Sequence, residues 1–155
     1  MTISRVASTI HYFDFTTNTD HVVPGNQLDL LSDIAGSRIA FTEVRADGEH
    51  VIVYDIASQA STIFPGAGKS NPSIGGNLVA FEDRSFLPGN QSEISLYDLS
   101  TGTVTRLTND TLFDKNPLSA PLAMLWYGRN VRLTVLAVTS TLPLGLRRGS
   151  SLTEL

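Results

Sequence analysis

The feature that most constrains the fold is a unit that recurs along most of the chain. Segments beginning at Thr9, His50 and Glu93 each contain an alternating apolar run, an aromatic-Asp pair, a polar turn and a second short β-type run. The spacings between successive pairs are 41 and 43 residues. The pairs are Phe13-Asp14, Tyr54-Asp55 and Tyr97-Asp98. Self-similarity with this period indicates a repeat architecture.

A second element recurs between the aromatic-Asp pairs. The segment GSRIAFTE, which begins at Gly36, matches GNLVAFED, which begins at Gly76. Apolar residues alternate in both segments, with Phe41 and Phe81 at matching positions, and this period of two predicts strands. Gly, Asn, Asp and Ser mark the turns, and no segment has a convincing helical period. We therefore predict an all-β fold made of four-stranded antiparallel sheets, the blades of a β-propeller.

The repeat boundaries predict about three blade equivalents. Residues 9–25 supply the last two strands of a blade, 26–66 and 67–109 supply two whole blades, and another blade starts at 110. Propellers typically have about 4–8 blades, so this is a partial ring. Either the chain is a fragment, or two copies form a homodimer that closes a six-bladed ring, with the half-blades pairing across the interface.

The stretch LYDLSTGTVTRLTND, followed by DKNP ending at Pro117, resembles the TolB-like family of propeller repeats. The resemblance covers residues 9–117. It implies a protein-binding platform that uses the ring face and the central channel. Relatives are often periplasmic or exported, but this chain shows no cationic and apolar leader, so its compartment is left open.

The repeated aromatic and acidic residues have a structural interpretation. An aromatic ring can fill the space between neighbouring blades, and an Asp before a turn can accept backbone N–H groups. A ligand or metal role for Asp14, Asp55 and Asp98 is the alternative. We assign repeat-structural roles to Phe13, Asp14, Phe41, Tyr54, Asp55, Phe81, Tyr97 and Asp98.

The C-terminal stretch 118–155 differs from the rest of the chain. Residues 1–117 carry 7 Lys or Arg and 14 Asp or Glu, whereas 118–155 carry 4 Arg and 1 Glu. Codon degeneracy allows another reading frame of the same stretch to encode residues that match the repeat, so we predict that the tail is frameshifted. Its segments 122–127 and 131–139 are still good strand material, which could continue the last blade.

Motifs that would indicate chemistry are incomplete. FPGAGKS (Phe64–Ser70) lacks the first Gly of a phosphate-binding loop and is followed by Asn71-Pro72, so we predict a loop between blades. The histidines His11, His21 and His50 show no metal-site spacing, and the chain has no Cys. We predict no catalytic residue, no cofactor and no metal.

The sequence favours a non-catalytic β-propeller protein, either an interaction scaffold or a fragment of a longer TolB-like propeller. Phe86 and Leu87, on a long loop, are candidate contacts for a protein partner. The net charge of −4 indicates no nucleic-acid partner, and the longest apolar stretch is too short for a membrane span.

The alternative is a propeller derived from an enzyme but inactive in this chain. It could come from a peptidase of the prolyl oligopeptidase type, whose separate hydrolase domain this sequence does not contain. It could also be lactonase-like, which would require Asn77, Glu82 and Asp83 or similar residues to converge on the channel.

Overall fold

The structure is a computed structural model that describes residues 7–26, 28–85, 91–110, 112–120, 123–128 and 134–136. Every regular element within these ranges is a β-strand, and all the strand pairs within the four sheets are antiparallel. The predicted all-β class is therefore confirmed. Among the described residues, no helix has the length and apolar character needed to cross a membrane.

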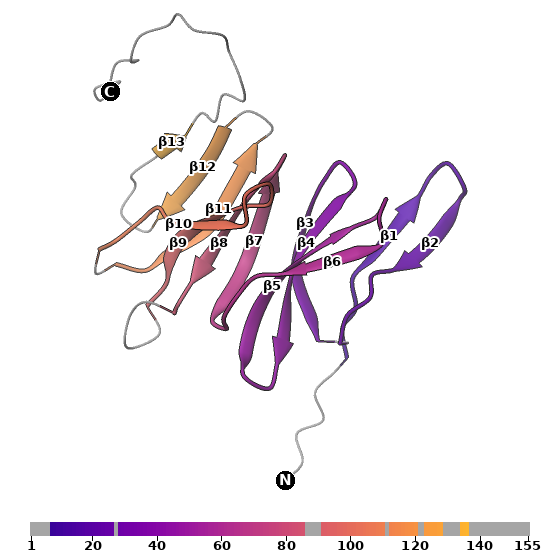
Figure 1. The fold of residues 1–155 in the computed structure, drawn as a ribbon, viewed down its shortest axis with the longest axis horizontal. Helices are drawn as coiled ribbons and strands as arrows, with labels where there is room; N and C mark the ends of the chain where they lie inside the picture. Colours follow the sequence, from indigo (N-terminus) through magenta and orange to yellow (C-terminus); the bar gives the residue numbers. More distant parts are fainter. Residues whose placement is uncertain are drawn as a thin grey trace, which may run out of the picture.

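Four sheets follow one another along the chain and lie in a row (Figure 1). The first has two strands, β1 (His11–Asp14) and β2 (Thr19–Val22). The second has four: β3 (Asp29–Ala35), β4 (Arg38–Arg45), β5 (Gly48–Asp55) and β6 (Ala60–Ile63). The third has β7 (Lys69–Gly75), β8 (Leu78–Asp83), β9 (Glu93–Asp98) and β10 (Thr103–Arg106). The fourth has β11 (Asp114–Ala120), β12 (Ala123–Gly128) and β13 (Thr134–Leu136).

The sheets repeat one another strand for strand. In the two four-stranded sheets each strand pairs only with its neighbours in sequence, from β3 to β6 and from β7 to β10. Tyr54 in β5 and Tyr97 in β9 occupy matching positions, paired with Ile39 and Val79. By the same alignment β1 and β2 correspond to the third and fourth strands of a full sheet. The strands β11, β12 and β13 correspond to the first, second and third.

The first strands β3, β7 and β11 each have a bulge, which in β3 lies between Leu30 and Asp33. The register shifts between Ser70 and Ser73 in β7 and between Lys115 and Pro117 in β11. Asn71 and Asn116 lie at these points with φ of 52° and 55°, a left-handed conformation that Asn tolerates better than most residues. The following Pro lacks an N–H, which suits a bulge on an edge strand.

The segment Phe64–Ser70 corrects one expectation. We predicted that it forms a loop between blades, but Lys69 and Ser70 already belong to β7. The loop therefore ends at Gly68, and the Lys of the apparent phosphate-binding motif is a buried strand residue.

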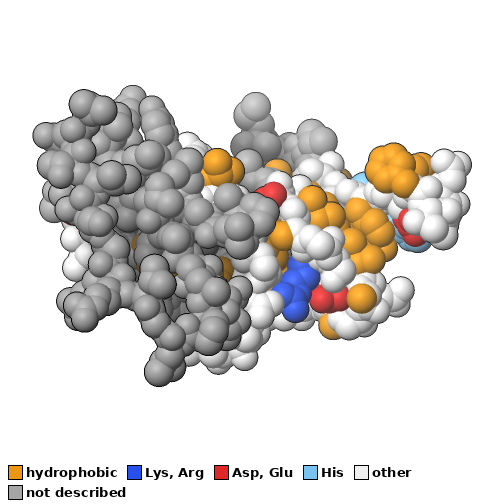
Figure 2. All heavy atoms as spheres, turned by 90° about the horizontal axis from the view of Figure 1, so that it is seen from above, with side chains coloured by type: hydrophobic (Ala, Val, Ile, Leu, Met, Phe, Trp, Pro, Cys, Tyr) orange, Lys and Arg blue, Asp and Glu red, His pale blue; other side chains and the backbone are white. Residues whose placement is uncertain are grey.

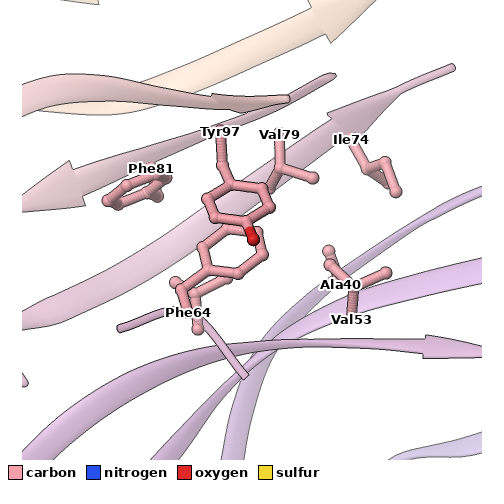
Figure 3. Packing of buried hydrophobic residues seen from close by; sticks show 8 residues of the cluster. Ala40, Val53, Phe64, Ile74, Val79, Phe81 and Tyr97 are labelled. Atoms are coloured by element: carbon pink, nitrogen blue, oxygen red, sulfur yellow. The ribbon is translucent and has the colours of Figure 1, made fainter. Parts of the chain in front are cut away.

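The main hydrophobic core lies between the two four-stranded sheets, at what we call the second junction. The second sheet contributes Ala40, Val51, Val53 and Phe64, and the third contributes Ile74, Val79, Phe81 and Tyr97 (Figure 3). The ring of Phe64 stacks on Tyr97, with centroids 4.0 Å apart and an interplanar angle of 14°. It also meets Phe81 edge-on at 5.5 Å. Residues from adjacent repeats therefore share one closely packed core.

The first junction repeats this arrangement one sheet earlier. Val23, which follows β2, packs with Phe41 and Tyr54 of the second sheet, and Ile10 and Tyr12 support them. Val23 corresponds to Phe64, because each follows the fourth strand of its sheet. The Val23 N–H donates to the carbonyl oxygen of Ile10, just before the third strand, and the Phe64 N–H donates to that of Val51, within the third strand. Each of the two four-stranded sheets thus packs an aromatic of its third strand, Tyr54 or Tyr97, near a linker residue of the sheet before it.

We expect Phe64→Ala to lower the free energy of unfolding by about 3–5 kcal/mol, because it opens a cavity between two buried rings. Urea denaturation followed by circular dichroism measures this. Phe15→Ala is the control, since Phe15 is exposed and its removal should cost less than about 0.5 kcal/mol. Equal effects of the two substitutions would contradict the packing described.

Candidate functional site

A cleft of about 580 Å³ opens at the ends of the innermost strands. The turn between β3 and β4 lines one side, with Gly36 and Ser37, and the turn between β7 and β8 lines the other, with Gly76 and Asn77. Gly36 and Gly76 both have φ of 60°, and no atom lies within 4 Å of a Cβ built at either. The turn backbones are therefore open to the cleft. Its size falls in the range of small-ligand and peptide sites.

Hydrogen bonds between neighbouring inner strands form the floor of the cleft. Asp33 accepts from the Ser73 hydroxyl and from the Ile74 N–H, both at 2.9 Å. One sheet further on, the Ser119 N–H donates to the Ser73 hydroxyl oxygen at 2.8 Å. The two hydroxyls of Ser73 and Ser119 also lie 2.9 Å apart. The Asp33 carboxylate and the Ser73 and Ser119 hydroxyls are thus already used to join the sheets.

Arg38 connects the cleft to one of the repeated acidic residues. Its Nε donates to Asp55 at 3.3 Å, and its Nη1 donates to the Asn77 side-chain oxygen at 2.6 Å. The guanidinium therefore ties the second sheet to the first turn of the third. It is half-buried, so it forms part of the cleft wall rather than a free cationic group.

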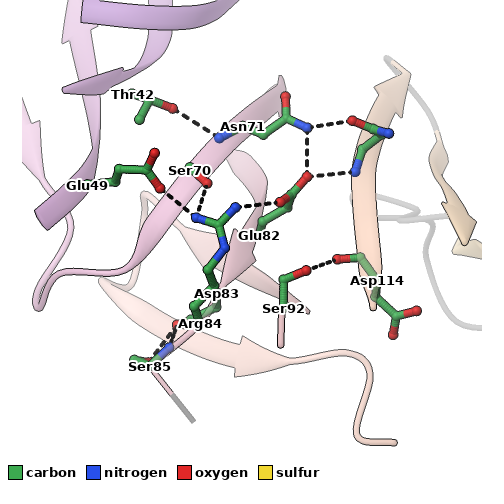
Figure 4. Close-up of polar contacts among 11 residues, drawn as sticks. Thr42, Glu49, Ser70, Asn71, Glu82, Asp83, Arg84, Ser85, Ser92 and Asp114 are labelled. Carbon is green, nitrogen blue, oxygen red and sulfur yellow. Dashed lines mark hydrogen bonds and ion pairs between the residues drawn. The ribbon is translucent and has the colours of Figure 1, made fainter. Parts of the chain in front are cut away.

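A second chain of polar contacts runs along the bulges at the other end of the inner strands (Figure 4). The Asn71 N–H donates to the Thr42 hydroxyl at 3.0 Å, and the Asn116 N–H donates to Glu82 at 3.0 Å. Thr42 and Glu82 occupy matching positions in β4 and β8. The Asn71 side-chain amide also reaches Glu82 and Asn116, at 2.9 Å each. The bulges of β7 and β11 are therefore each fixed by an acceptor on the preceding sheet.

Arg84 extends this network to Glu49 in β5. Its guanidinium contacts Glu49 of the second sheet, and it reaches Glu82 at 3.1 Å and the Ser70 hydroxyl at 3.1 Å (Figure 4). Because one Arg bridges carboxylates from two sheets, the network couples the sheets electrostatically as well as through the apolar core.

We expect Thr42→Val to lower the free energy of unfolding by about 1–2 kcal/mol, since it removes the acceptor of the Asn71 N–H with little change of volume. Thr62→Val, at an exposed position of β6, is the control and should change it by less than about 0.5 kcal/mol. Thermal or urea unfolding of the three proteins provides the measurement. A Thr42→Val protein as stable as the control would contradict a structural role for this bond.

Acidic groups are buried at the start of the inner strands. Asp29 pairs across strands with Glu43, and Lys69 pairs with Asp83 at the matching place in the next sheet. Lys69 Nζ lies 3.7 Å from Asp83 Oδ2, so that sheet has a buried ion pair. Burial raises the pKa of Asp29, the nearby Glu43 carboxylate raises it further, and the Asn26 N–H partly opposes this. Asp114, at the third matching place, also has a pKa raised mainly by burial.

We expect Asp29→Asn to stabilise the protein at pH 7. A raised pKa in the folded state means that stability is fully present below the unfolded value near 3.8 and falls as the pH rises through the folded value. The substitution removes this loss, so its advantage should shrink as the pH drops toward 3.8. Urea denaturation at several pH values measures it.

Asp98→Asn is the matched control for that experiment. The Ser100 hydroxyl and N–H lower the pKa of Asp98, so the charged form stabilises the fold above pH 3.8 and this stabilisation is lost on acidification. The control should therefore be less stable than the parent at pH 7. A destabilised Asp29→Asn protein at pH 7 would contradict the assignment.

The repeated acidic residues lie at matching turns. Asp14 accepts the Thr16 N–H at 2.7 Å, Asp55 accepts the Ala57 N–H at 2.9 Å, and Asp98 accepts the Ser100 N–H at 2.8 Å. Backbone N–H donors also lower the pKa of Asp14 and, through Ser58, that of Asp55. This geometry is that of an Asx turn, in which the carboxylate holds the backbone.

The repeated aromatic residues divide into two groups. Phe41, Phe81, Tyr54 and Tyr97 are buried at the junctions, whereas Phe13 is exposed on β1. The structure does not bring these residues together at one site. The candidate partner contacts Phe86 and Leu87 lie outside the described residues.

The remaining predicted polar residues are dispersed. Asn77 precedes β8, whereas Glu82 and Asp83 end it, which separates them by roughly 16 Å at about 3.3 Å per residue. His11 contacts Asp20 at 2.8 Å, His50 contacts Asp47 at 3.0 Å, and His21 stacks on Tyr12. Within the described ranges, no group of three His, Asp, Glu or Cys could hold a metal ion.

Sequence reasoning missed the residues that define the inner edge. Asn71 and Asn116 lie in polar segments without an alternating apolar pattern, and no motif marks Arg38 or Ser37. The recurrence of Asn-Pro in SNPS and KNPL was the available signal, since a repeated Asn-Pro pair marks a bulge or turn.

Comparison with known proteins identifies the fold. No protein-family model and no curated protein matches the chain. TolB from Acinetobacter baumannii superposes with a TM-score of 0.60 at 16% identity, over 86% of this chain and 36% of that one. A TolB-type protein from Agrobacterium tumefaciens gives 0.64 at 18%, over 83% and 49%. The fold is a partial β-propeller.

A third neighbour is the β-propeller domain of the Trilobed protease from Pyrococcus furiosus, with a TM-score of 0.56 at 16% identity, over 66% of this chain and 34% of that one. The chain thus spans between about a third and a half of these three structures. Its sheets are propeller blades, and the cleft lies where the inner strands of neighbouring blades meet. These likenesses confirm the predicted propeller fold.

Proposed function

We propose that the chain is a non-catalytic part of a β-propeller and that it binds a short segment of a partner protein in the cleft. The observation that carries this proposal is the cleft itself, about 580 Å³, between two glycine-containing turns with open backbone. The empty space beside Gly36 and Gly76 lets the backbone of an extended peptide approach these turns closely. The TolB-like fold favours the same use of the inner edge.

The polar groups of the cleft support binding rather than catalysis. Ser73 and Ser119 are the hydroxyls nearest its floor, and both are engaged in hydrogen bonds with each other or with Asp33. A serine nucleophile needs a base that takes its proton, usually a His oriented by a third group. Here the groups around the hydroxyls are a carboxylate and backbone N–H groups, which hold neighbouring blades in register.

The test is peptide binding with a blocked cleft. Displayed random peptides are selected against the purified chain, and the dissociation constants of the selected peptides are measured for the parent, Ser37→Trp and Ser58→Trp. Ser37 lines the cleft, whereas Ser58 lies in the exposed β5–β6 turn. We expect Ser37→Trp to weaken binding at least tenfold, about 1.4 kcal/mol, and Ser58→Trp to leave it unchanged. Failure to select a binder, or equal affinity of all three proteins, would overturn the proposal.

A second candidate is a propeller derived from a peptidase and inactive in this chain. The observation in its favour is the likeness to the propeller domain of the Trilobed protease. An assay with chromogenic peptide substrates separates the possibilities. No turnover is expected from either candidate, so turnover that survives repurification and is lost in Ser73→Ala would contradict both.

A further inference from the structure

The two ends of the row of blades expose apolar residues at positions that are covered inside the row. Ile34 in β3 is 56% exposed, whereas its counterpart Ile74 in β7 is 4% exposed. Ile74 is covered because it packs into the second junction against the sheet before it. Ile34 faces the same way, but the sheet before it has only β1 and β2, which correspond to outer strands. The inner positions in front of Ile34 are therefore open.

Leu118 in β11 is the complementary case at the other end. It corresponds to Asp33 and Ser73, which face the following blade and hydrogen-bond it. The residue after it, Ser119, faces backward onto Ser73, so alternation along the strand directs Leu118 forward. Leu118 is 56% exposed, and no described sheet follows its own.

An apolar residue of the outer strand β1 is exposed at the same end of the row of blades. Phe13 is 45% exposed, whereas the matching Tyr54 and Tyr97 are 5% and 9% exposed. Those two pack at junctions with Val23 and Phe64, linker residues of the preceding blade. Phe13 instead meets the exposed Phe15 edge-on, with ring centroids 5.1 Å apart. Figure 2 shows hydrophobic side chains gathered on the end of the molecule that lies opposite the undescribed residues.

We propose that a second copy of this chain covers these positions. The inner strands β11 and β12 of one copy fill the open inner positions beside β1 of the other, so Leu118 of one copy faces Ile34 of the other. At the internal junctions the corresponding pairs are Asp33 with Ile74 and Ser73 with Ser119. The contact between the two copies therefore repeats an interface that already occurs twice within the chain. An apolar pair, Leu118 and Ile34, takes the place of the hydrogen-bonded pair.

The numbers of strands in the first and last sheets allow the two copies to complete each other's blades. The first sheet has the third and fourth strands of a blade, and the last has the first and second plus β13, which is only three residues long. In the assembly β1 takes the place of β13 beside β12. Two copies related by a two-fold axis then form two such mixed blades and leave no open end, which makes the closed pair the favoured state.

The primary experiment measures solution mass by light scattering. The parent should have twice the 16.7 kDa chain mass, and Ile34→Asp and Leu118→Lys should each have the single-chain mass. Ile63→Asp is the control, since Ile63 is 47% exposed on β6, inside the row, and it should remain dimeric. Mixing Ile34→Asp with Leu118→Lys should restore the dimer, because the mixed pair has one native junction and one junction of opposite charges.

A cross-link tests the same contact independently of stability. The chain has no Cys, so Ile34→Cys and Leu118→Cys introduce single thiols. Oxidation of the mixture should give a disulfide-linked pair, and oxidation of either variant alone should not. A monomeric parent, variants that stay dimeric, a mixture that stays monomeric, or cross-linking of one variant to itself would overturn the proposal. None of these readouts depends on peptide binding in the cleft.

Discussion

The contact on which the rest of the structure depends is the packing of each blade onto the linker of the blade before it. Phe64 follows the fourth strand of one sheet, and Tyr97 stacks on it from the third strand of the next. A single repeat cannot bury its hydrophobic faces alone, so this packing between neighbouring repeats supplies the core. The order of the sheets in space therefore follows directly from their order in sequence.

The hydrogen bonds between the first strands of neighbouring blades depend on this packing. Once the blades are stacked, the bulges at Asn71 and Asn116 present their N–H groups to acceptors on the preceding blade. Further along the same strands, Asp33 and Ser73 accept N–H groups from the following blade. Bulge, strand end and turn are thereby fixed relative to one another, and the open turns that remain form the cleft.

Much of the fold was predictable from the sequence because its signals are local. The aromatic-Asp pairs reveal the third strands and their turns, since an Asp bonds its own turn a few residues away. The first strands of the repeats, β3, β7 and β11, were not predicted, because Asn71 and its neighbours are polar and contain Pro. Their strand pairing and their acceptors come from residues such as Thr42, which lies 29 positions away.

The candidate site was not predictable for the same reason. The turns that line the cleft lie in successive repeats, and their juxtaposition depends on how closely two sheets stack. Asp29 and Lys69 occupy matching buried positions of successive repeats, and this difference is visible in the sequence once the repeats are aligned. Its consequence, a carboxyl group with a raised pKa, depends on burial that only the folded structure defines.

The most direct test of this account is a double-mutant cycle on Phe64 and Tyr97. Unfolding free energies are measured for the parent, Phe64→Leu, Tyr97→Leu and the double variant, and the coupling energy is their non-additive part. Stacked rings 4.0 Å apart should give a favourable coupling of about 1 kcal/mol. A coupling energy of zero would mean that the two rings do not meet in solution, and the blade-to-blade packing described would be contradicted.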